Sequence, residues 1–195
     1  ASAGRTHGND LAWNVKLMSL NMFPNLFVYA TLEAAITAIN YAVDNGADVI
    51  NASFGQADDD LDPDEGFMAF VEVMERVHKA GIPFVAAAGN SAGDNDKKGM
   101  IPATLDFDNI VAAGAMHASG YNCLSSNFGK NSVEVMAPGV NIYTTSTSGM
   151  KSVNGTSLSA PMVTGIVVLM LDVNPNLTAY QIREILADSC DPFEP

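Results

Sequence analysis

The sequence contains few of the residues that nucleic-acid or membrane binding requires. Of its 195 residues only 9 are Lys or Arg, against 22 Asp or Glu, so the formal net charge is -13. Phosphate backbones and anionic lipid surfaces repel a chain this acidic. The longest apolar run, residues 166–173, is shorter than a bilayer crossing needs. We therefore expect no nucleic acid and no membrane among its partners.

Cysteine and glycine spacings that mark other kinds of site are also missing. The two cysteines, Cys123 and Cys190, stand far apart and predict ordinary free thiols. No G-x-G-x-x-G or G-x-x-x-x-G-K-[ST] loop is present, which argues against a nucleotide-binding domain. The chain does contain 48% hydrophobic residues, enough for the core of one domain.

Hydrophobic patterns in the first two thirds of the chain predict alternating strands and helices. Strands are predicted at residues 15–20, 48–55, 82–90 and 109–115, and helices at 32–45 and, after an N-cap at Asp62, up to residue 79. Strand, helix, strand in this order indicates crossover connections between parallel strands. The predicted fold is therefore α/β, a doubly wound parallel sheet flanked by helices.

The last third is predicted to change from long strands to short ones before two helices. Extended runs at residues 133–137, 142–146 and 150–153 are separated by turn residues, and the last two could pair as a hairpin. A helix then runs to about Val173, where Asn174-Pro175 ends it. Thr178 and Gln181 form a capping box for a final helix through residue 187.

Small polar residues and glycines follow two predicted strands and precede the first of these helices. The segments are Ser53-Phe54-Gly55, Ala88-Gly89-Asn90 and Asn154-Gly155-Thr156-Ser157. Ligands bind at the carboxyl ends of parallel strands, so the segments would line one crevice. Ser157 opens an apolar helix, where backbone N–H groups favour negative charge, which suits a nucleophile. Each segment alone also reads as a glycine-assisted turn or a helix cap, and only their co-occurrence favours a site.

The three segments, in this order, resemble those of the subtilisin-like serine peptidases. The run from Gly155 to Pro161 resembles the nucleophile motif of that family. Residues 85–90 resemble the strand that presents the oxyanion-hole asparagine, and residues 50–55 are similar to the strand that pairs with bound peptide. Residues 127–129 and 135–139 match further landmarks. The resemblance extends from about Trp13 to Ala187 and implies a subtilisin-like fold.

The resemblance also implies a role for each matched residue. Ser157 would attack the peptide bond, and the carboxamide of Asn90 with the Ser157 N–H would stabilise the oxyanion, one such donor contributing about 3 kcal/mol. Ser53, Phe54 and Gly55 would pair with the substrate strand. The wall of the first specificity pocket would come from Ala86, Ala87, Ala88 and Gly89, whose missing side chains leave room for a large residue. Asn154 and Gly155 complete the expected substrate-binding set.

The base that Ser157 needs is not identified in this sequence. In the family an Asp and a His precede the matched segment, and none of His7, His78 and His117 fits the pattern. We therefore expect residues 1–195 to form one partial peptidase domain that lacks its N-terminal part, with Asp and His supplied by an upstream segment or chain. The isolated chain would be inactive or nearly so. The alternative is a peptide-binding relative without catalysis.

The remaining expectations concern metals, substrate charge, location and association. His117 stands where many members of the family have a cation-binding Asp, so no metal and no cofactor is assigned, and calcium would belong to the complete domain. The acidic run at residues 58–65 is predicted as a solvated loop, or, if it flanks the cleft, as a preference for basic substrates. The family implies secretion or a secretory-pathway or vesicular location. Exposed sheet edges predict self-association.

Overall fold

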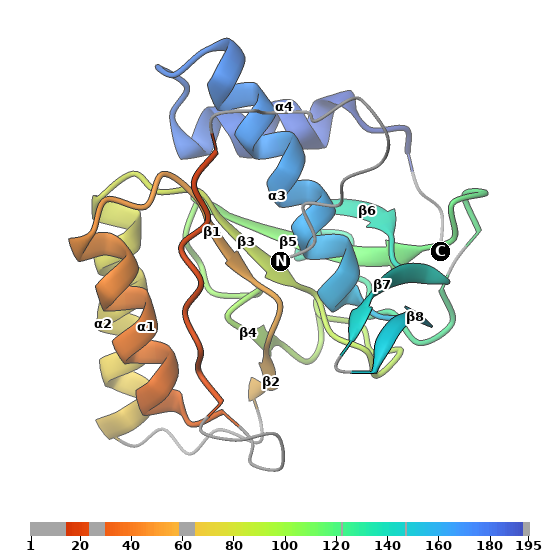
Figure 1. Cartoon of the computed structure of the whole chain (residues 1–195), viewed down its shortest axis with the longest axis horizontal. Helices are drawn as coiled ribbons and strands as arrows, with labels where there is room; N and C mark the ends of the chain where they lie inside the picture. Colours follow the sequence, from red (N-terminus) through yellow and green to blue (C-terminus); the bar gives the residue numbers. More distant parts are fainter. Residues whose placement is uncertain (1–14, 24–29, 59–64, 122, 147, 193–195) are drawn as a thin grey trace.

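The structure, a computed structural model, describes residues 15–23, 30–58, 65–121, 123–146 and 148–192. At its centre is a four-stranded sheet in the spatial order β1 (Ile50–Ala52), β3 (Phe84–Ala87), β5 (Ile110–Met116) and β6 (Val135–Pro138) (Figure 1). All neighbouring strands pair in parallel, with Val85 opposite both Asn51 and Val111. The sheet places the carboxyl ends of β1 and β3 next to each other.

Helices cover both faces of this sheet because side chains alternate along each strand. In β3, Phe84 and Ala86 pack in a core with α1 (Leu32–Asp44) and α2 (Glu65–Lys79). Val85 and Ala87 of the same strand pack in a second core, with α3 (Thr156–Val173) and α4 (Ala179–Ser189). A fully buried valine such as Val85 contributes about 1.5–3 kcal/mol. The predicted α/β arrangement, a parallel sheet flanked by helices, is confirmed.

The helix ends follow the signals that the sequence carries. Thr31 caps α1 by accepting a hydrogen bond from the Ala34 N–H at 3.1 Å. The capping box of α4 is complete, since Thr178 Oγ1 accepts from the Gln181 N–H and Gln181 accepts in return from the Thr178 N–H. Asn174 follows the last residue of α3, as predicted.

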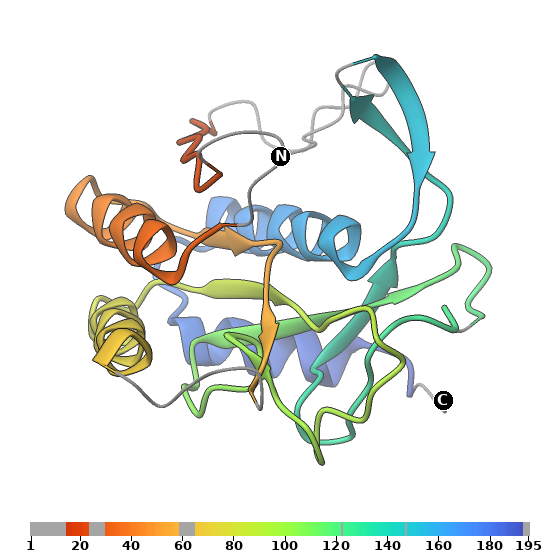
Figure 2. The ribbon, with the colours of Figure 1, turned by 90° about the horizontal axis from the view of Figure 1, so that it is seen from below.

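Two smaller antiparallel pairs extend from the main sheet. β2 (Gln56–Ala57) pairs with β4 (Met100–Ile101), and β7 (Ile142–Ser146) pairs with β8 (Gly149–Val153). Figure 2 shows the β7–β8 hairpin projecting from the body of the molecule. The predicted hairpin is therefore confirmed, and it leads directly into the turn before α3.

The prediction of a buried strand at residues 15–20 is wrong. These residues form no regular strand, and Val15, Leu17 and Met18 are 45%, 66% and 41% exposed. A strand needs a hydrogen-bonded neighbour, and no described strand pairs with this segment. His7 and most of the acidic run lie outside the described residues.

The apolar stretch of helix α3 is longer than the uninterrupted run at residues 166–173. Among the described helices it is the one long and apolar enough to cross a membrane, with 18 residues and a mean hydropathy of 1.7. Here Ala160, Val163 and Val167 pack against the sheet. Length and composition alone are weak evidence for a membrane span, since the core helix of a folded domain passes the same test.

Candidate active site

Ser157 lies where the carboxyl end of β1 meets the first turn of α3. Its side chain is part-buried, and its Oγ donates a hydrogen bond to the main-chain oxygen of Ser53 at 3.0 Å. This bond joins segments that are far apart in sequence. Ser157 is the second residue of α3, so its N–H has no acceptor within the helix. The serine therefore combines a hydroxyl with a backbone donor at the positive end of a helix.

The turn before Ser157 depends on two glycines. Gly155 caps α3 with φ of 144°, a conformation that other residues avoid. Its N–H donates to the Gly139 oxygen at 2.8 Å. A Cβ at Gly139 would lie 2.3 Å from Ser159 Oγ and 2.9 Å from the Gly155 oxygen. The chain after β6 can support the start of α3 only because Gly139 has no side chain.

Asn90 is fixed beside this helix start by its side-chain oxygen. Asn90 Oδ1 accepts from the Thr156 N–H at 2.9 Å and from Thr156 Oγ1 at 3.3 Å. A backbone N–H can donate only to the oxygen of the carboxamide, so this contact assigns Oδ1 and Nδ2. Asn90 Nδ2 donates to no other group among the described residues. Asn90 Nδ2 and the Ser157 N–H thus remain as donors for an oxyanion at one helix start.

Thr156 connects the two segments that supply these donors, the end of β3 and the start of α3. It is fully buried, and its Oγ1 accepts from the Gly89 N–H at 3.2 Å while donating to Asn90. One hydroxyl therefore holds the segment 89–90 against the start of α3. The sequence motif contained Thr156, but its role as a support was not predicted because the contact depends on tertiary geometry.

A pair of buried asparagines holds the loop that follows Asn90. Asn127 Oδ1 accepts from the backbone N–H groups of Ser91 and Gly93 at 2.8 and 3.1 Å. Its Nδ2 donates to Asn95 Oδ1 at 2.9 Å, and the Asn127 N–H donates to the Gly89 oxygen at 2.9 Å. Both asparagines are at most 5% exposed. Hydrogen bonds of the two buried side-chain amides thus hold the loop in place.

Asp96 attaches the same loop to residues 129–132. Its carboxylate accepts from Ser132 Oγ at 2.7 Å and from the N–H and Nδ2 groups of Asn131. The Ser132 hydrogen bond, together with those of Asn131 and the Lys130 N–H, lowers the pKa of Asp96 below its ordinary value. A lowered pKa stabilises the fold above the unfolded pKa, and this contribution is lost as the pH falls through the folded value.

Known proteins with similar sequences identify the family of this chain. A sequence profile described as the subtilase family matches residues 1–192. The chain belongs to the subtilase family. It is 33% identical over 202 residues to subtilisin DY of Bacillus licheniformis, covering 95% of this chain and 70% of that protein. It is 30% identical to subtilisin amylosacchariticus of Bacillus subtilis subsp. amylosacchariticus, covering 94% of this chain and 50% of that protein.

Solved structures give the same fold for this subtilase chain. The structure of prenylagaramide maturation protease PagA superposes with a TM-score of 0.76 at 26% sequence identity. The match covers 89% of this chain and 63% of that one. The chain spans half to about two thirds of the length of most of these relatives. By this likeness it resembles serine endopeptidases.

The predicted substrate-binding residues divide into two groups in this subtilase. Ala86, Ala87 and Ala88 are buried, at 0%, 4% and 0% exposure, and the first two pack in the two cores. The Ala88 N–H and oxygen are already bonded to the Ala113 oxygen and to Asn95 Nδ2. A role of these alanines in a pocket wall stays a prediction.

The second group lies at the helix start or beside it. Ser53 contacts Ser157 directly, and Gly155 approaches Asn90, where an added Cβ would lie 3.4 Å from Asn90 Oδ1. Asn154 has another task, because its Oδ1 accepts from the Asn141 N–H at 2.7 Å and holds the base of the β7–β8 hairpin. Contact of Asn154 or Phe54 with substrate also stays a prediction.

No described histidine is hydrogen-bonded to Ser157. His78 on α2 is hydrogen-bonded to Asp108, with 2.8 Å between Nε2 and Oδ1, and its ring packs on Phe107. The His117 N–H donates to the Tyr121 oxygen in the turn after β5. In the described part of the chain no group of three His, Cys, Asp or Glu side chains could hold a metal ion. Ser157 thus lies beside two donors that could bind an oxyanion, and no base is hydrogen-bonded to it among the described residues.

Proposed function

We propose that this chain carries the nucleophile and the oxyanion hole of a subtilisin-like serine endopeptidase. The observation that supports this most is the hydrogen bond of Asn90 Oδ1 to the Thr156 N–H, one residue before Ser157. It leaves Nδ2 as a preorganised donor next to the nucleophile. Preorganised donors in such a site stabilise the developing oxyanion without reorganisation at the moment of reaction.

The chemistry would follow the acyl-enzyme route. Ser157 Oγ attacks the carbonyl carbon of the scissile peptide bond, and its proton passes to a base. The oxyanion that forms is bound by the Ser157 N–H and Asn90 Nδ2. The leaving amine takes the proton, an ester of Ser157 remains, and water hydrolyses it. The substrate is a peptide or protein whose main chain lies along residues 53–55.

The base and its orienting acid come, in this proposal, from an upstream segment or a separate chain. Two features support an additional element at this side of the sheet. β1 is one of the two edge strands of the described sheet, and α3, which packs on it, exposes Met162 and Ile166, at 36% and 47%. Ser157 Oγ meanwhile donates to a main-chain oxygen, which cannot take up its proton. The chain alone is then inactive or nearly so.

The proposal includes the other expectations from the family. It places the complete protein in the secretory pathway, in vesicles or outside the cell, and expects no nucleic-acid or membrane partner. Calcium would bind in the complete domain and is not assigned to residues of this chain. The acidic charge of -13 supports the exclusion of polyanionic partners.

Labelling with a fluorophosphonate tests the proposal directly. The isolated chain is expected to react at least roughly 10³-fold more slowly than subtilisin DY, because the residual rate comes from binding and the oxyanion hole alone. Labelling should be confined to Ser157 and abolished in Ser157→Ala, while the control Ser152→Ala, on the exposed strand β8, labels like the unaltered chain. Rapid labelling of the isolated chain would contradict the missing base.

A non-catalytic peptide-binding relative is the second candidate. The hydrogen bond from Ser157 Oγ to the Ser53 oxygen favours it, since this hydroxyl is directed to a main-chain acceptor. The two candidates differ in the complete polypeptide. Hydrolysis of casein by the complete polypeptide, lost in Ser157→Ala, supports the peptidase, whereas peptide binding without turnover supports the alternative.

A further inference from the structure

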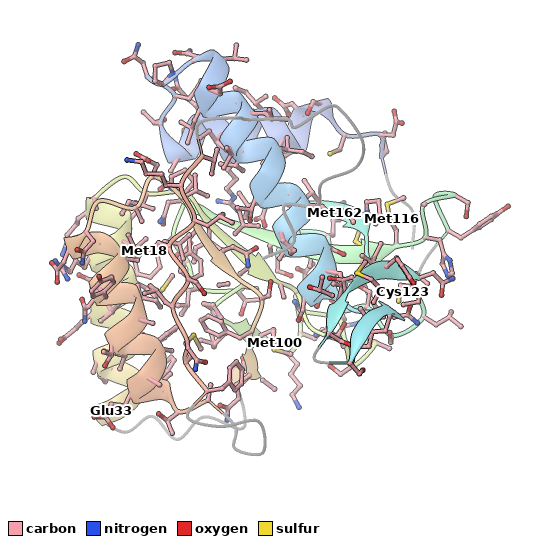
Figure 3. All side chains as sticks on the ribbon, viewed as in Figure 1. Met18, Glu33, Met100, Met116, Cys123 and Met162 are labelled. Carbon is pink, nitrogen blue, oxygen red and sulfur yellow. The ribbon has the colours of Figure 1, made fainter. Side chains whose placement is uncertain are left out.

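The Met100 side chain lies between Gly55, which follows β1, and Gly89, which follows β3. A Cβ built on Gly55 would lie 3.2 Å from Met100 Sδ and 3.3 Å from Met100 Cγ. A Cβ built on Gly89 would lie 2.6 Å from Met100 Cε and 2.5 Å from Asn127 Nδ2. The thioether therefore extends from one glycine to the other. Figure 3 labels Met100 in the centre of the molecule, near β4 and the end of β1.

The backbone of Met100 is held firmly at this place. Met100 is the first residue of β4 and pairs with Ala57 of β2, the strand that follows Gly55. Its N–H donates to Thr104 Oγ1 at 3.0 Å, and its oxygen accepts from the Thr104 N–H at 3.0 Å. The β2–β4 pair and Thr104 thus hold Met100 next to both strand ends.

The region between Gly55 and Gly89 lies next to the proposed oxyanion donors, so a substrate side chain would bind there. A substrate carbonyl bound by the Ser157 N–H and Asn90 Nδ2 belongs to the residue just before the scissile bond. The side chain of that residue lies next to Gly89, the neighbour of Asn90, and next to Gly55 if the main chain runs along residues 53–55. Glycine at both positions adds no side chain there, but the Met100 thioether lies against both glycines and reduces the room that is left.

We propose that Met100 is the residue that determines substrate specificity before the scissile bond, restricting this position to small side chains such as Gly, Ala or Ser. This inference rests on the proposed function, because it uses the same Ser157 site. It replaces the expectation that missing side chains on Gly89 and its neighbours leave room for a large residue. An aromatic ring could enter only if the flexible thioether left its place.

Equilibrium binding of product-like peptides measures this preference on the 195-residue chain. Two N-acetylated tetrapeptides that differ only in a C-terminal Ala or Phe are titrated by calorimetry. The unaltered chain should bind the Ala peptide at least about tenfold more tightly, the size of effect expected when a hydrophobic pocket is too small for its ligand. Met100→Ala should bind the Phe peptide about tenfold more tightly than the unaltered chain does.

Two further variants separate this effect from general changes. Met100→Leu keeps a side chain of similar volume and should retain the preference for Ala. Met68→Ala removes an exposed methionine of α2, 55% exposed, and should leave both affinities unchanged. The preference of the unaltered chain needs no variant, so it tests the inference even if Met100→Ala does not fold.

The outcomes distinguish this inference from the function on which it rests. Equal binding of both peptides by the unaltered chain, or a folded Met100→Ala without a gain for Phe, overturns the role of Met100 and leaves the peptide site intact. Failure of the unaltered chain, Met100→Ala and Met100→Leu to bind either peptide overturns the peptide site itself, and the inference with it.

Discussion

Two glycines of the same helix show how differently one residue type can act. Gly155 caps α3 with φ of 144°, whereas Gly165 lies on its exposed side with no atom within 4 Å of an added Cβ. Gly155→Ala is expected to lower the free energy of unfolding by about 1–3 kcal/mol through backbone strain. Gly165→Ala is expected to raise it by about 1 kcal/mol, because alanine favours helix. Urea unfolding followed by circular dichroism measures both.

The pair of variants also contains its own control. Nearest to a Cβ on Gly155 is Asn90 Oδ1 at 3.4 Å, an ordinary contact, so steric overlap adds little to the cost. If Gly155→Ala proves as stable as the unaltered chain, the left-handed conformation at this cap is not a requirement for the position of Ser157. A destabilising Gly165→Ala would show instead that this face of α3 is covered.

Individual site residues were predictable to the extent that they lie in contiguous motifs. Ser157, Asn90 and Ser53 were each predicted from short segments, and the structure brings all three to the first turn of α3. Met100 was missed because nothing in its own neighbourhood marks it. Its proposed role arises from its position against Gly55 and Gly89, which follow the strands β1 and β3.

At the scale of elements, one ion pair attaches α4 to the sheet. Arg183 donates from Nε and Nη2 to Glu134 Oε1 at 3.1 and 2.6 Å, and Glu134 Oε2 accepts from the Ala112 N–H at 2.6 Å. The Glu134 side chain is only 10% exposed. Arg183→Met is expected to cost about 2–3 kcal/mol, because it leaves a carboxylate buried without its cation.

The matched variant of the partner should cost less. Glu134→Gln still offers an oxygen to the Ala112 N–H, and Arg183, 29% exposed, can turn toward water, so about 1 kcal/mol is expected. Differential scanning calorimetry of both variants decides the order. If Glu134→Gln is the more damaging of the two, the glutamate charge contributes more to the stability of the fold than its desolvation costs.

Elements were predicted well where local signals and burial agree. The capping box at Thr178 and the end of α3 at Asn174 depend on residues close in sequence, and both predictions are confirmed. The strand predicted at residues 15–20 failed for the opposite reason. Its hydrophobic pattern is suitable, but a strand exists only when another strand pairs with it, and sequence pattern carries no information about that neighbour.

At the scale of the whole molecule, the described sheet is unprotected at one side. β1 is one of its two edge strands, and its residue Asn51 is exposed there while accepting a hydrogen bond from Thr164 Oγ1 of α3 at 2.9 Å. Met162 and Ile166 are one helical turn apart on α3, so they lie on one exposed side. An edge strand next to exposed apolar side chains favours pairing with another chain.

We therefore expect the isolated chain to self-associate, and more strongly as salt is added. The net charge of -13 opposes association, and salt above about 0.5 M screens charges beyond a few ångströms while leaving the apolar contact intact. Sedimentation equilibrium should show the dimer fraction rising with sodium chloride. Ile166→Lys should lower it at every salt concentration, because a charge would be buried in the contact.

A second lysine variant separates burial from charge. Leu124→Lys, in the loop between β5 and β6 where Leu124 is 92% exposed, changes the net charge by the same amount but lies on no edge strand. By lowering the repulsion between chains it should leave association unchanged or raise it slightly. Equal weakening by both lysines would place the contact elsewhere than α3 and β1. A monomer at all salt concentrations would show that the exposed side of β1 and α3 does not drive association of this chain with itself.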